Sequence, residues 1–289
     1  KPINTNEYFV ICINSLGSCF GSTSPISINP ETDEPYRLSF PVLSVEDIAN
    51  AANELLKVLD ISVLHAVIGP SMGGMSALSF CQLHPGKAKR LISISSAARS
   101  SPFSIALRSL QREIIRNDPS WKNGAYDLNG NGPISGMRLA RKLGMITYRS
   151  AKEWSARFGR ERAMEKDLQS GAFGVDFEIE SYLESHANKF IGAFDPNCYL
   201  YLSRAMDLFD ASDPDGNLEN SFKQLKLEEA LIIGVETDLL FPISQQEELA
   251  EALEKYVNKV RLVRLDSLQG HDSFLVDMDR FRPVISSFI

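Results

Sequence analysis

One stretch, HAVIGPSMGGMSALSF at residues 65–80, limits the folds that this chain can adopt. An apolar run ends in glycine and proline around Ser71, and an apolar pattern with helical spacing follows. Residues 69–73 fit G-x-S-x-G, in which a serine at a strained strand-to-helix turn projects its hydroxyl above a sheet. Glycines are expected on both sides of that serine because a Cβ atom there would collide with the strand or the helix. The stretch therefore predicts a sheet that carries an exposed serine nucleophile.

Apolar runs typical of buried strands alternate with helical patterns through the rest of the chain. The predicted strands are residues 8–13, 63–69, 90–97, 229–237 and 260–266, and the clearest helices between them are residues 44–60, 72–84 and 244–257. Strands that alternate with helices indicate a mostly parallel, doubly wound α/β sheet.

Residues 98–228 interrupt this alternation with helical, polar sequence, which we interpret as an inserted helical lid. The core is then divided between residues 1–97 and residues 229–289. We expect this core to be incomplete at its N-terminal side, because only KPINTNE precedes the predicted strand at residues 8–13. The expectation is that the chain is a fragment or that another polypeptide supplies further strands.

A serine nucleophile of this kind works with a histidine base and an acid, which follow it in the order Ser, then Asp or Glu, then His. His271 lies in QGHDSF, directly after the last predicted strand, where a loop can return over the strand ends. Glu236 and Asp238 lie at the end of the strand predicted at residues 229–237, and Asp238 is favoured because it lies in the loop, whereas Glu236 still belongs to the strand. His65, His84 and His186 have ordinary structural positions. We therefore predict the triad Ser71, Asp238 and His271.

Acyl transfer through a serine also requires two backbone donors for the oxyanion. The amide of Met72, the residue after the nucleophile, is expected to supply the first. The second comes from a loop after an earlier strand, and that loop has no counterpart in the seven residues before Tyr8.

Charge and composition exclude several other functions. The net charge of −7 argues against a nucleic-acid-binding protein. No apolar run approaches the length of about 20 residues that a membrane-spanning helix needs. The four scattered cysteines predict reduced, mostly buried thiols and a cytoplasmic protein, without a metal site or a disulfide framework. DLNGNG at Asp127 begins like an EF-hand loop, but its twelfth position is Arg138 instead of a bidentate Glu.

Several segments resemble the homoserine O-acetyltransferase family of α/β-hydrolase-fold acyltransferases, from near residue 8 to the C-terminus. They include NSLGSCFGSTSP, GPSMGGMSAL, LARKLGMITYRSAKEWSARFGR and GHDSFLVD. RSLQRE and YLYLSRAMDLFD are most similar to the serine O-succinyltransferase branch. The resemblance implies an α/β-hydrolase fold, acyl-CoA as a co-substrate, no resident cofactor, and a homodimer formed through the lid.

The resemblance also implies a ping-pong reaction, in which Ser71 takes an acyl group from acyl-CoA and passes it to an amino-acid hydroxyl. Succinyl transfer to L-serine is the favoured version, and acetyl or succinyl transfer to homoserine is the alternative. By the same resemblance Arg141 binds the substrate carboxylate and Asp272 contacts its amino group, with Arg138 and Arg149 as weaker candidates. An esterase is a further alternative, because the same triad hydrolyses esters when water reaches the acyl-enzyme.

Overall fold

The computed structural model describes residues 2–130, 132–164, 173–212 and 216–289. Within these ranges a parallel sheet has the strand order β3-β4-β5-β6. Its strands are β3 (Leu64–Pro70), β4 (Ala88–Ile94), β5 (Glu229–Val235) and β6 (Lys259–Leu265). A short antiparallel pair, β1 (Ile28–Asn29) and β2 (Glu34–Pro35), lies in the loop region before α1.

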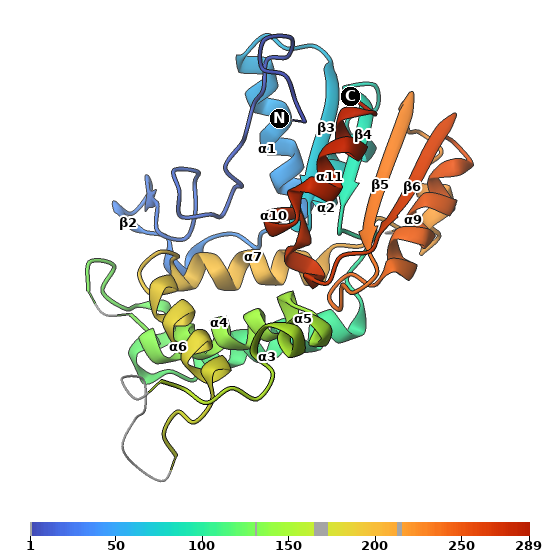
Figure 1. Cartoon of the computed structure of the whole chain (residues 1–289). Coiled ribbons are helices and arrows are strands. Elements are labelled where there is room, and N and C mark those ends of the chain that lie inside the picture. The colour runs from blue at the N-terminus through green and yellow to red at the C-terminus, as the bar shows by residue number, and fades with distance from the viewer. Residues whose placement is uncertain (1, 131, 165–172, 213–215) are drawn as a thin grey trace.

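Helices cover both faces of this sheet (Figure 1). The face with α1 (Val45–Val58), α2 (Met72–Leu83) and α9 (Ile243–Glu254) forms the larger hydrophobic core. The opposite face packs against α11 (Met278–Ser286), which follows the short helix α10 (Ser273–Val276). The predicted doubly wound parallel α/β fold is therefore confirmed.

The central strands are apolar on both faces, as a sheet between two helical layers requires. In β4, Leu91 faces the larger core and its neighbour Ile92 faces α11; both are fully buried. The helices begin where the sequence provides caps: the Ser44 hydroxyl accepts a hydrogen bond from the Asp47 amide, and the Asp47 carboxylate accepts one from the Ser44 amide. Local sequence and tertiary burial thus favour the same elements.

Six α-helices lie between β4 and β5 in the sequence, within the described residues. They are α3 (Pro102–Arg116), α4 (Ile134–Tyr148), α5 (Ala151–Phe158), α6 (Glu178–Phe190), α7 (Pro196–Leu208) and α8 (Leu218–Ser221). Figure 1 shows α3 to α7 gathered beyond one end of the strands. Residues of this layer, among them Ile115, Met137 and Leu200, form a separate buried cluster. The layer corresponds to the segment predicted as a lid, although its lid action remains a prediction.

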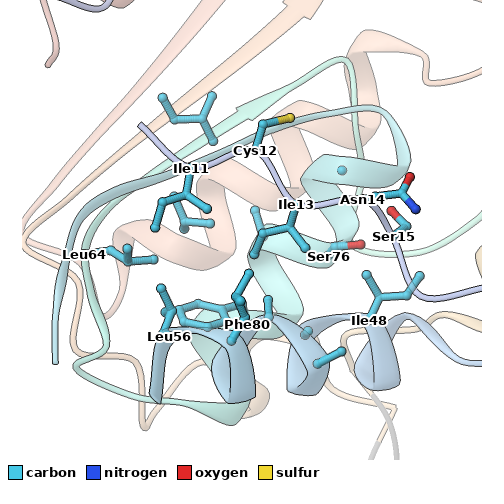
Figure 2. Close-up of a pocket in the computed structure, with 18 of the residues that line it drawn as sticks. Ile11, Cys12, Ile13, Asn14, Ser15, Ile48, Leu56, Leu64, Ser76 and Phe80 are labelled. Atoms are coloured by element: carbon cyan, nitrogen blue, oxygen red, sulfur yellow. The ribbon is translucent and has the colours of Figure 1, made fainter. Parts of the chain in front are cut away.

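The prediction of a strand at residues 8–13 is wrong. Those residues do not form the hydrogen bonds of a strand, and Phe9 is 81% exposed. Their β-branched and aromatic composition fits a buried strand, but a strand also needs a neighbouring backbone to pair with. A cavity separates this segment from β3, the nearest edge of the sheet (Figure 2). The pattern therefore identifies strand-like sequence that pairs with no strand among the described residues.

Two further expectations concern membranes and cysteines. In the described ranges, no helix combines the length and apolar character needed to cross a membrane. All four cysteines are free; Cys81 and Cys198 are buried, Cys19 is half-buried and Cys12 is exposed. The exposure of Cys12 differs from the expectation of mostly buried thiols. Cys12 is exposed because it belongs to the unpaired segment at residues 8–13.

Candidate active site

Ser71 stands at the turn between β3 and α2 with a backbone conformation of φ 53° and ψ −124°. This is a left-handed conformation that a residue with a Cβ atom adopts only under strain. The surrounding structure holds it there, since the Ser71 amide donates to the carbonyl of Ile94 at 2.9 Å and Met72 begins α2 directly afterwards. The predicted strained turn is therefore present at Ser71.

The glycines around Ser71 differ in whether a Cβ atom would fit at their positions. A Cβ atom at Gly69 would lie 2.0 Å from the carbonyl oxygen of Gly73, which excludes any side chain. At Gly73 itself the nearest atom would be the Cδ of Pro70 at 3.4 Å, so the expected collision is absent there. The second close approach is at Gly74, where a Cβ atom would lie 2.5 Å from that of Ser96. The expectation was correct for Gly69 and wrong for Gly73.

Three predicted side chains form one hydrogen-bonded chain. The Nε2 of His271 lies 2.9 Å from the Oγ of Ser71, and its Nδ1 lies 2.8 Å from the Oδ2 of Asp238. The other carboxylate oxygen of Asp238 accepts hydrogen bonds from the amides of Leu240 and Phe241. Asp238 and His271 are each only 4% exposed. The carboxylate can thus fix the tautomer of His271 that presents an unprotonated Nε2 to Ser71.

The loop that carries His271 is fixed to the loop that carries Asp238. The hydroxyl of Thr237 donates to the carbonyl of Ser267 at 2.6 Å and accepts from the Gly270 amide at 3.1 Å. Gly270 has a φ of +65°, and a Cβ atom there would lie 2.9 Å from the carbonyl oxygen of Tyr148 at the end of α4. Sequence reasoning did not select Thr237 or Gly270, although each is adjacent to a predicted site residue.

The alternative acid and the other histidines lie elsewhere. Glu236 is exposed, and its side chain makes no described contact with His271. His65 contacts the carbonyl of Ile289, His84 the side chain of Asn50, and His186 the ring of Tyr182. The structure therefore places Asp238 and His271, and not these alternatives, next to Ser71.

A cavity of about 470 Å³ opens beside Ser71, between the sheet and the helices α3, α4 and α7. Its lining includes Ser71, Arg108, Arg141, Tyr148, Phe190 and His271. Met72 also lines it, and its amide belongs to the first residue of α2, where no carbonyl four residues earlier is available within the helix. This amide is therefore free to donate a hydrogen bond to an oxyanion, which is the role that the sequence predicts for it.

Arg141 is the cation in this cavity that is best placed to bind an anion. Its guanidinium lies over the rings of Phe190 and Tyr148, at 4.7 and 5.6 Å from their centroids. Its Nε is buried and has no hydrogen-bond partner among the described residues. The weaker candidates are already engaged: Arg138 pairs with Glu184 at 2.6 Å, and Arg149 pairs with Asp272 at 3.4 Å.

Asp272 lies next to the cavity but does not form part of its lining. Its carboxylate faces the guanidinium of Arg149. Burial raises the pKa of the Asp272 carboxyl above its ordinary value, while the positive charges of Arg149 and Arg141 oppose that rise. The predicted contact of Asp272 with a substrate amino group requires the carboxylate to turn from Arg149 toward the cavity.

Arg108 is a site residue that sequence reasoning missed. It is 7% exposed and lines the cavity from α3. Its Nε donates to Asp207 at 2.6 Å and its Nη2 donates to the Ser100 hydroxyl at 2.6 Å. Arg112 pairs with the second oxygen of Asp207 at 2.6 Å, so one buried carboxylate serves two guanidinium groups. Of these three charged side chains, Arg108 lines the same cavity as Ser71.

No group of three metal-ligating side chains occurs within residues 2–130, 132–164, 173–212 and 216–289. Near the EF-hand-like DLNGNG, the Asp127 carboxylate accepts a hydrogen bond from the amide of Asn129, as in a turn. Position 131 of that motif lies outside the described residues.

The fold and the Ser71 turn define an α/β-hydrolase-fold protein, and residues 1–277 match the family described as alpha/beta hydrolase fold. A serine O-succinyltransferase from Stenotrophomonas maltophilia (strain K279a) is 53% identical over 290 residues, which cover all of this chain and 78% of that protein. A second one, from Xanthomonas campestris pv. campestris (strain B100), is 52% identical over 300 residues and is covered to 79%. Within the α/β-hydrolase fold, the chain belongs to the acyltransferase family that contains these proteins.

Solved structures agree with this assignment. The homoserine O-acetyltransferase from Bacillus anthracis superposes with a TM-score of 0.84 at 26% identity, covering 92% of this chain and 70% of the other. The esterase E22 superposes with a TM-score of 0.81 at 31% identity, covering 92% and 72%. The resemblance to the homoserine O-acetyltransferase family and the prediction of an acyltransferase are thereby confirmed.

Proposed function

We propose that this enzyme transfers a succinyl group from succinyl-CoA to the hydroxyl of L-serine through an acyl-enzyme on Ser71. The observation that carries the proposal is the hydrogen-bonded chain from Asp238 through His271 to Ser71, which ends at a cavity lined by two arginines. The high identity to proteins named serine O-succinyltransferase supports this choice of substrates.

In the first half-reaction the Oγ of Ser71 attacks the thioester carbonyl carbon, and the Nε2 of His271 takes the hydroxyl proton. Asp238 stabilises the imidazolium that forms, because its carboxylate is held 2.8 Å from the Nδ1. The amide of Met72 donates to the oxygen that becomes negatively charged. When the C–S bond breaks, His271 gives its proton to the CoA sulfur, and a succinyl ester remains on Ser71.

In the second half-reaction the hydroxyl of L-serine occupies the place of the departed thiol. His271 now takes the proton of this hydroxyl while its oxygen attacks the ester carbonyl. Breaking of the bond to the Ser71 Oγ returns the proton to that oxygen and releases O-succinyl-L-serine. The same imidazole therefore acts as the base for both attacks, which requires its Nε2 to reach both oxygens.

Succinyl transfer to serine brings two carboxylates to one cavity, one on the acyl group and one on the amino acid. Arg141, with an unpartnered Nε, suits the amino-acid carboxylate, because its planar guanidinium can donate two hydrogen bonds to it. Arg108 lines another part of the same cavity. We assign it to the carboxylate of the succinyl group, which an acetyl donor lacks. This arrangement favours a dicarboxylic acyl donor.

An esterase is the second candidate, because the esterase E22 shares the fold with 31% identity. Hydrolysis differs from transfer only in the second nucleophile, which is water in place of the serine hydroxyl. Homoserine is the alternative acceptor, and it differs from serine by one methylene group, which a pocket distinguishes by about 1–3 kcal/mol. Both alternatives use the same Ser71 ester.

The test measures release of free CoA from succinyl-CoA and acetyl-CoA, each with L-serine, L-homoserine or no acceptor. The proposal predicts the highest kcat/KM for succinyl-CoA with L-serine. Release at an unchanged rate without an acceptor would identify an esterase, and preference for L-homoserine would establish the alternative acceptor. Arg108→Met should lower kcat/KM more for succinyl-CoA than for acetyl-CoA, whereas the exposed Arg204→Met on α7 should change neither.

We also infer that the enzyme forms a homodimer through the helical layer at residues 98–228. Phe103 and Leu110 of α3 are 53% and 47% exposed, and Leu139 and Ile146 of α4 are 44% and 48% exposed. The members of each pair are seven residues apart and so share a helix face. Two adjacent helices with apolar outer faces support an interface at this layer.

A further inference from the structure

The loop that carries His271 is held from two sides. On the side of the sheet, the hydroxyl of Thr237 donates to the Ser267 carbonyl and accepts from the Gly270 amide. On the other side the loop meets the junction at residues 148–150, where α4 ends and α5 begins. This junction therefore joins the helical layer to the catalytic histidine.

Ser150 makes two hydrogen bonds at once, and it is only 4% exposed. Its hydroxyl oxygen accepts from the amide of Glu153 at 3.0 Å, which caps the N-terminus of α5. The single proton of the same hydroxyl is donated to the carbonyl of Leu268, three residues before His271. Capping alone would not require this second contact. Ser150 thus ties the start of α5 to the loop of His271.

Arg149 contacts the same loop through its guanidinium. Its Nη1 donates to the side-chain oxygen of Gln269, and its Nε lies 3.4 Å from the carboxylate of Asp272. These two partners precede and follow His271 in the sequence, so one guanidinium spans the histidine. The buried carboxylate of Glu153 lies 3.9 Å from the same Nη1. Because a guanidinium is a rigid planar fork, contacts on several sides fix its orientation.

The backbones of the loop and the junction pack directly against each other. A Cβ atom added at Gly270 would lie 2.9 Å from each of three backbone atoms, which are the carbonyl oxygen of Tyr148, the carbonyl carbon of Arg149 and the amide nitrogen of Ser150. The loop and the junction therefore leave no space for even a methyl group between them. A shift of the junction toward the loop must displace the loop.

The helix that ends at this junction also lines the cavity beside Ser71. Arg141 and Tyr148 of α4 both belong to the lining, and they are about two helical turns apart. The ring centroid of Tyr148 lies 6.1 Å from that of His271. One helix thus provides part of the cavity wall and, at its C-terminal end, the contacts to the loop of the base.

We propose that Arg149 and Ser150 are positioning residues, which hold the loop of His271 from the helical layer. They keep the Nε2 of its imidazole aligned with the Oγ of Ser71, and they act through the neighbours of the histidine rather than on the reacting atoms. A misplacement of a catalytic group by about 1 Å can slow a reaction about 10²-fold. The further consequence, that acceptor binding and alignment of the base share one helix, rests on the proposed role of Arg141.

A purely structural role is the alternative, because Ser150 caps a helix and Arg149 belongs to a buried group of charges. The two roles differ in what they predict. A loss of stability alone lowers the fraction of folded molecules and leaves the rate of each folded molecule unchanged. Misplacement of the base lowers that rate itself.

The experiment measures inactivation of the chain by a fluorophosphonate, in which the Oγ of Ser71 attacks phosphorus, fluoride leaves and His271 takes the proton. Saturation kinetics separates reagent binding, KI, from the maximal rate, kinact. Ser150→Ala and Arg149→Met should each lower kinact by about 10- to 100-fold and leave KI unchanged. Ser150→Thr keeps the hydroxyl and should retain most of the wild-type kinact. The reagent contains neither a succinyl group nor an amino acid, so the result is independent of the substrates proposed above.

Two matched variants control for the loss of a cap and of an ion pair. Ser44→Ala removes the N-cap of α1 in the core. Arg99→Met removes an ion pair that joins the helical layer to Glu248 of α9. Both variants should keep the wild-type kinact. Denaturant unfolding of every variant gives its stability, so that all rates refer to folded protein.

A double-mutant cycle tests whether Arg149 acts through the loop. Gln269→Leu should lower kinact less than Arg149→Met does, because the contact with Asp272 remains. Adding Gln269→Leu to Arg149→Met should cause no further loss, since the shared contact is already absent. The proposal is overturned by a wild-type kinact in either Ser150→Ala or Arg149→Met, by equal losses in the controls, by Ser150→Thr as slow as Ser150→Ala, or by additive effects in the cycle.

Discussion

The Nε2 of His271 lies 2.9 Å from the Oγ of Ser71, although 200 residues separate them in the sequence. Two different constraints create this contact. The turn between β3 and α2 holds Ser71 in a strained conformation, and the loop after β6 returns His271 to the same strand ends. Phe241 packs flat against the His271 ring, with centroids 5.2 Å apart, so the imidazole has little freedom to leave this position.

Gly270 should be necessary for the position of His271. Gly270→Ala places a Cβ atom 2.9 Å from the end of α4 and also strains a φ of +65°, whereas Gly192→Ala strains a similar φ in open space. Gly192→Ala should lower the free energy of unfolding by about 1–2 kcal/mol, and Gly270→Ala by more. Displacement of His271 should also lower kcat about 10²-fold in Gly270→Ala alone. Denaturant unfolding and steady-state kinetics measure both; equal effects of the two substitutions would contradict this role.

Arg141 should matter for the acceptor. Replacing Arg141 with Ala removes charge-assisted hydrogen bonds to the amino-acid carboxylate, which should lower kcat/KM for L-serine by about 10- to 100-fold. Arg141→Lys should recover only part of this loss, because an ammonium cannot form the paired contact. Arg138→Ala is the matched control, since Arg138 pairs with Glu184 and does not line the cavity. Kinetics at varied L-serine concentration test this, and a control that loses as much as Arg141→Ala would count against the assignment.

Asp272 should make stability depend on pH. Because burial raises the pKa of its carboxyl in the folded state, folding favours the protonated form. The unfolded chain releases this proton first, so stability contributed by Asp272 falls as pH rises from its ordinary pKa of 3.8 to the raised folded value. The Asp272→Asn variant does not lose this stability. As the pH rises between the two pKa values, its free energy of unfolding should therefore increase relative to that of the wild type, and the difference should then level off. A difference independent of pH would contradict the prediction.

The homodimer predicts a specific effect of surface charge. Leu110→Glu with Leu139→Glu should convert the enzyme to a monomer, because burying two carboxylates in an apolar interface is costly. Leu59→Glu is a suitable control, since Leu59 follows α1 and is 43% exposed, similar to Leu139 at 44%. Sedimentation equilibrium measures the outcome. A wild-type monomer, or a dimer unaffected by the two lid substitutions, would show that the interface lies elsewhere or is absent.

The positions of Ser71, Asp238 and His271 could be predicted from the sequence because each follows directly from a local pattern. A strand end precedes each residue, and the carboxyl ends of parallel strands lie along one edge of the sheet. Asp238 was preferred to Glu236 for the same reason, and the structure places Asp238 in contact with His271. Such residues are recognisable when local sequence and chain order carry the same information.

Arg108 could not be found in this way. Its position in the cavity depends on Asp207, which lies 99 residues further along the chain and fixes its guanidinium only when α3 packs against α7. Residues 8–13 illustrate the opposite case. Their local pattern is that of a strand, but hydrogen-bonded pairing requires a neighbour that the pattern cannot provide.

The central claim is that Ser71 carries the acyl group and that His271 activates it. The most direct measurement incubates the enzyme with succinyl-CoA, without an acceptor, and locates the added succinyl group by mass spectrometry of a digest. We expect one succinyl group on the peptide that contains Ser71, none in Ser71→Ala, and acylation slowed by about 10²- to 10⁴-fold in His271→Ala. Succinyl on another residue, or unchanged acylation in His271→Ala, would contradict it.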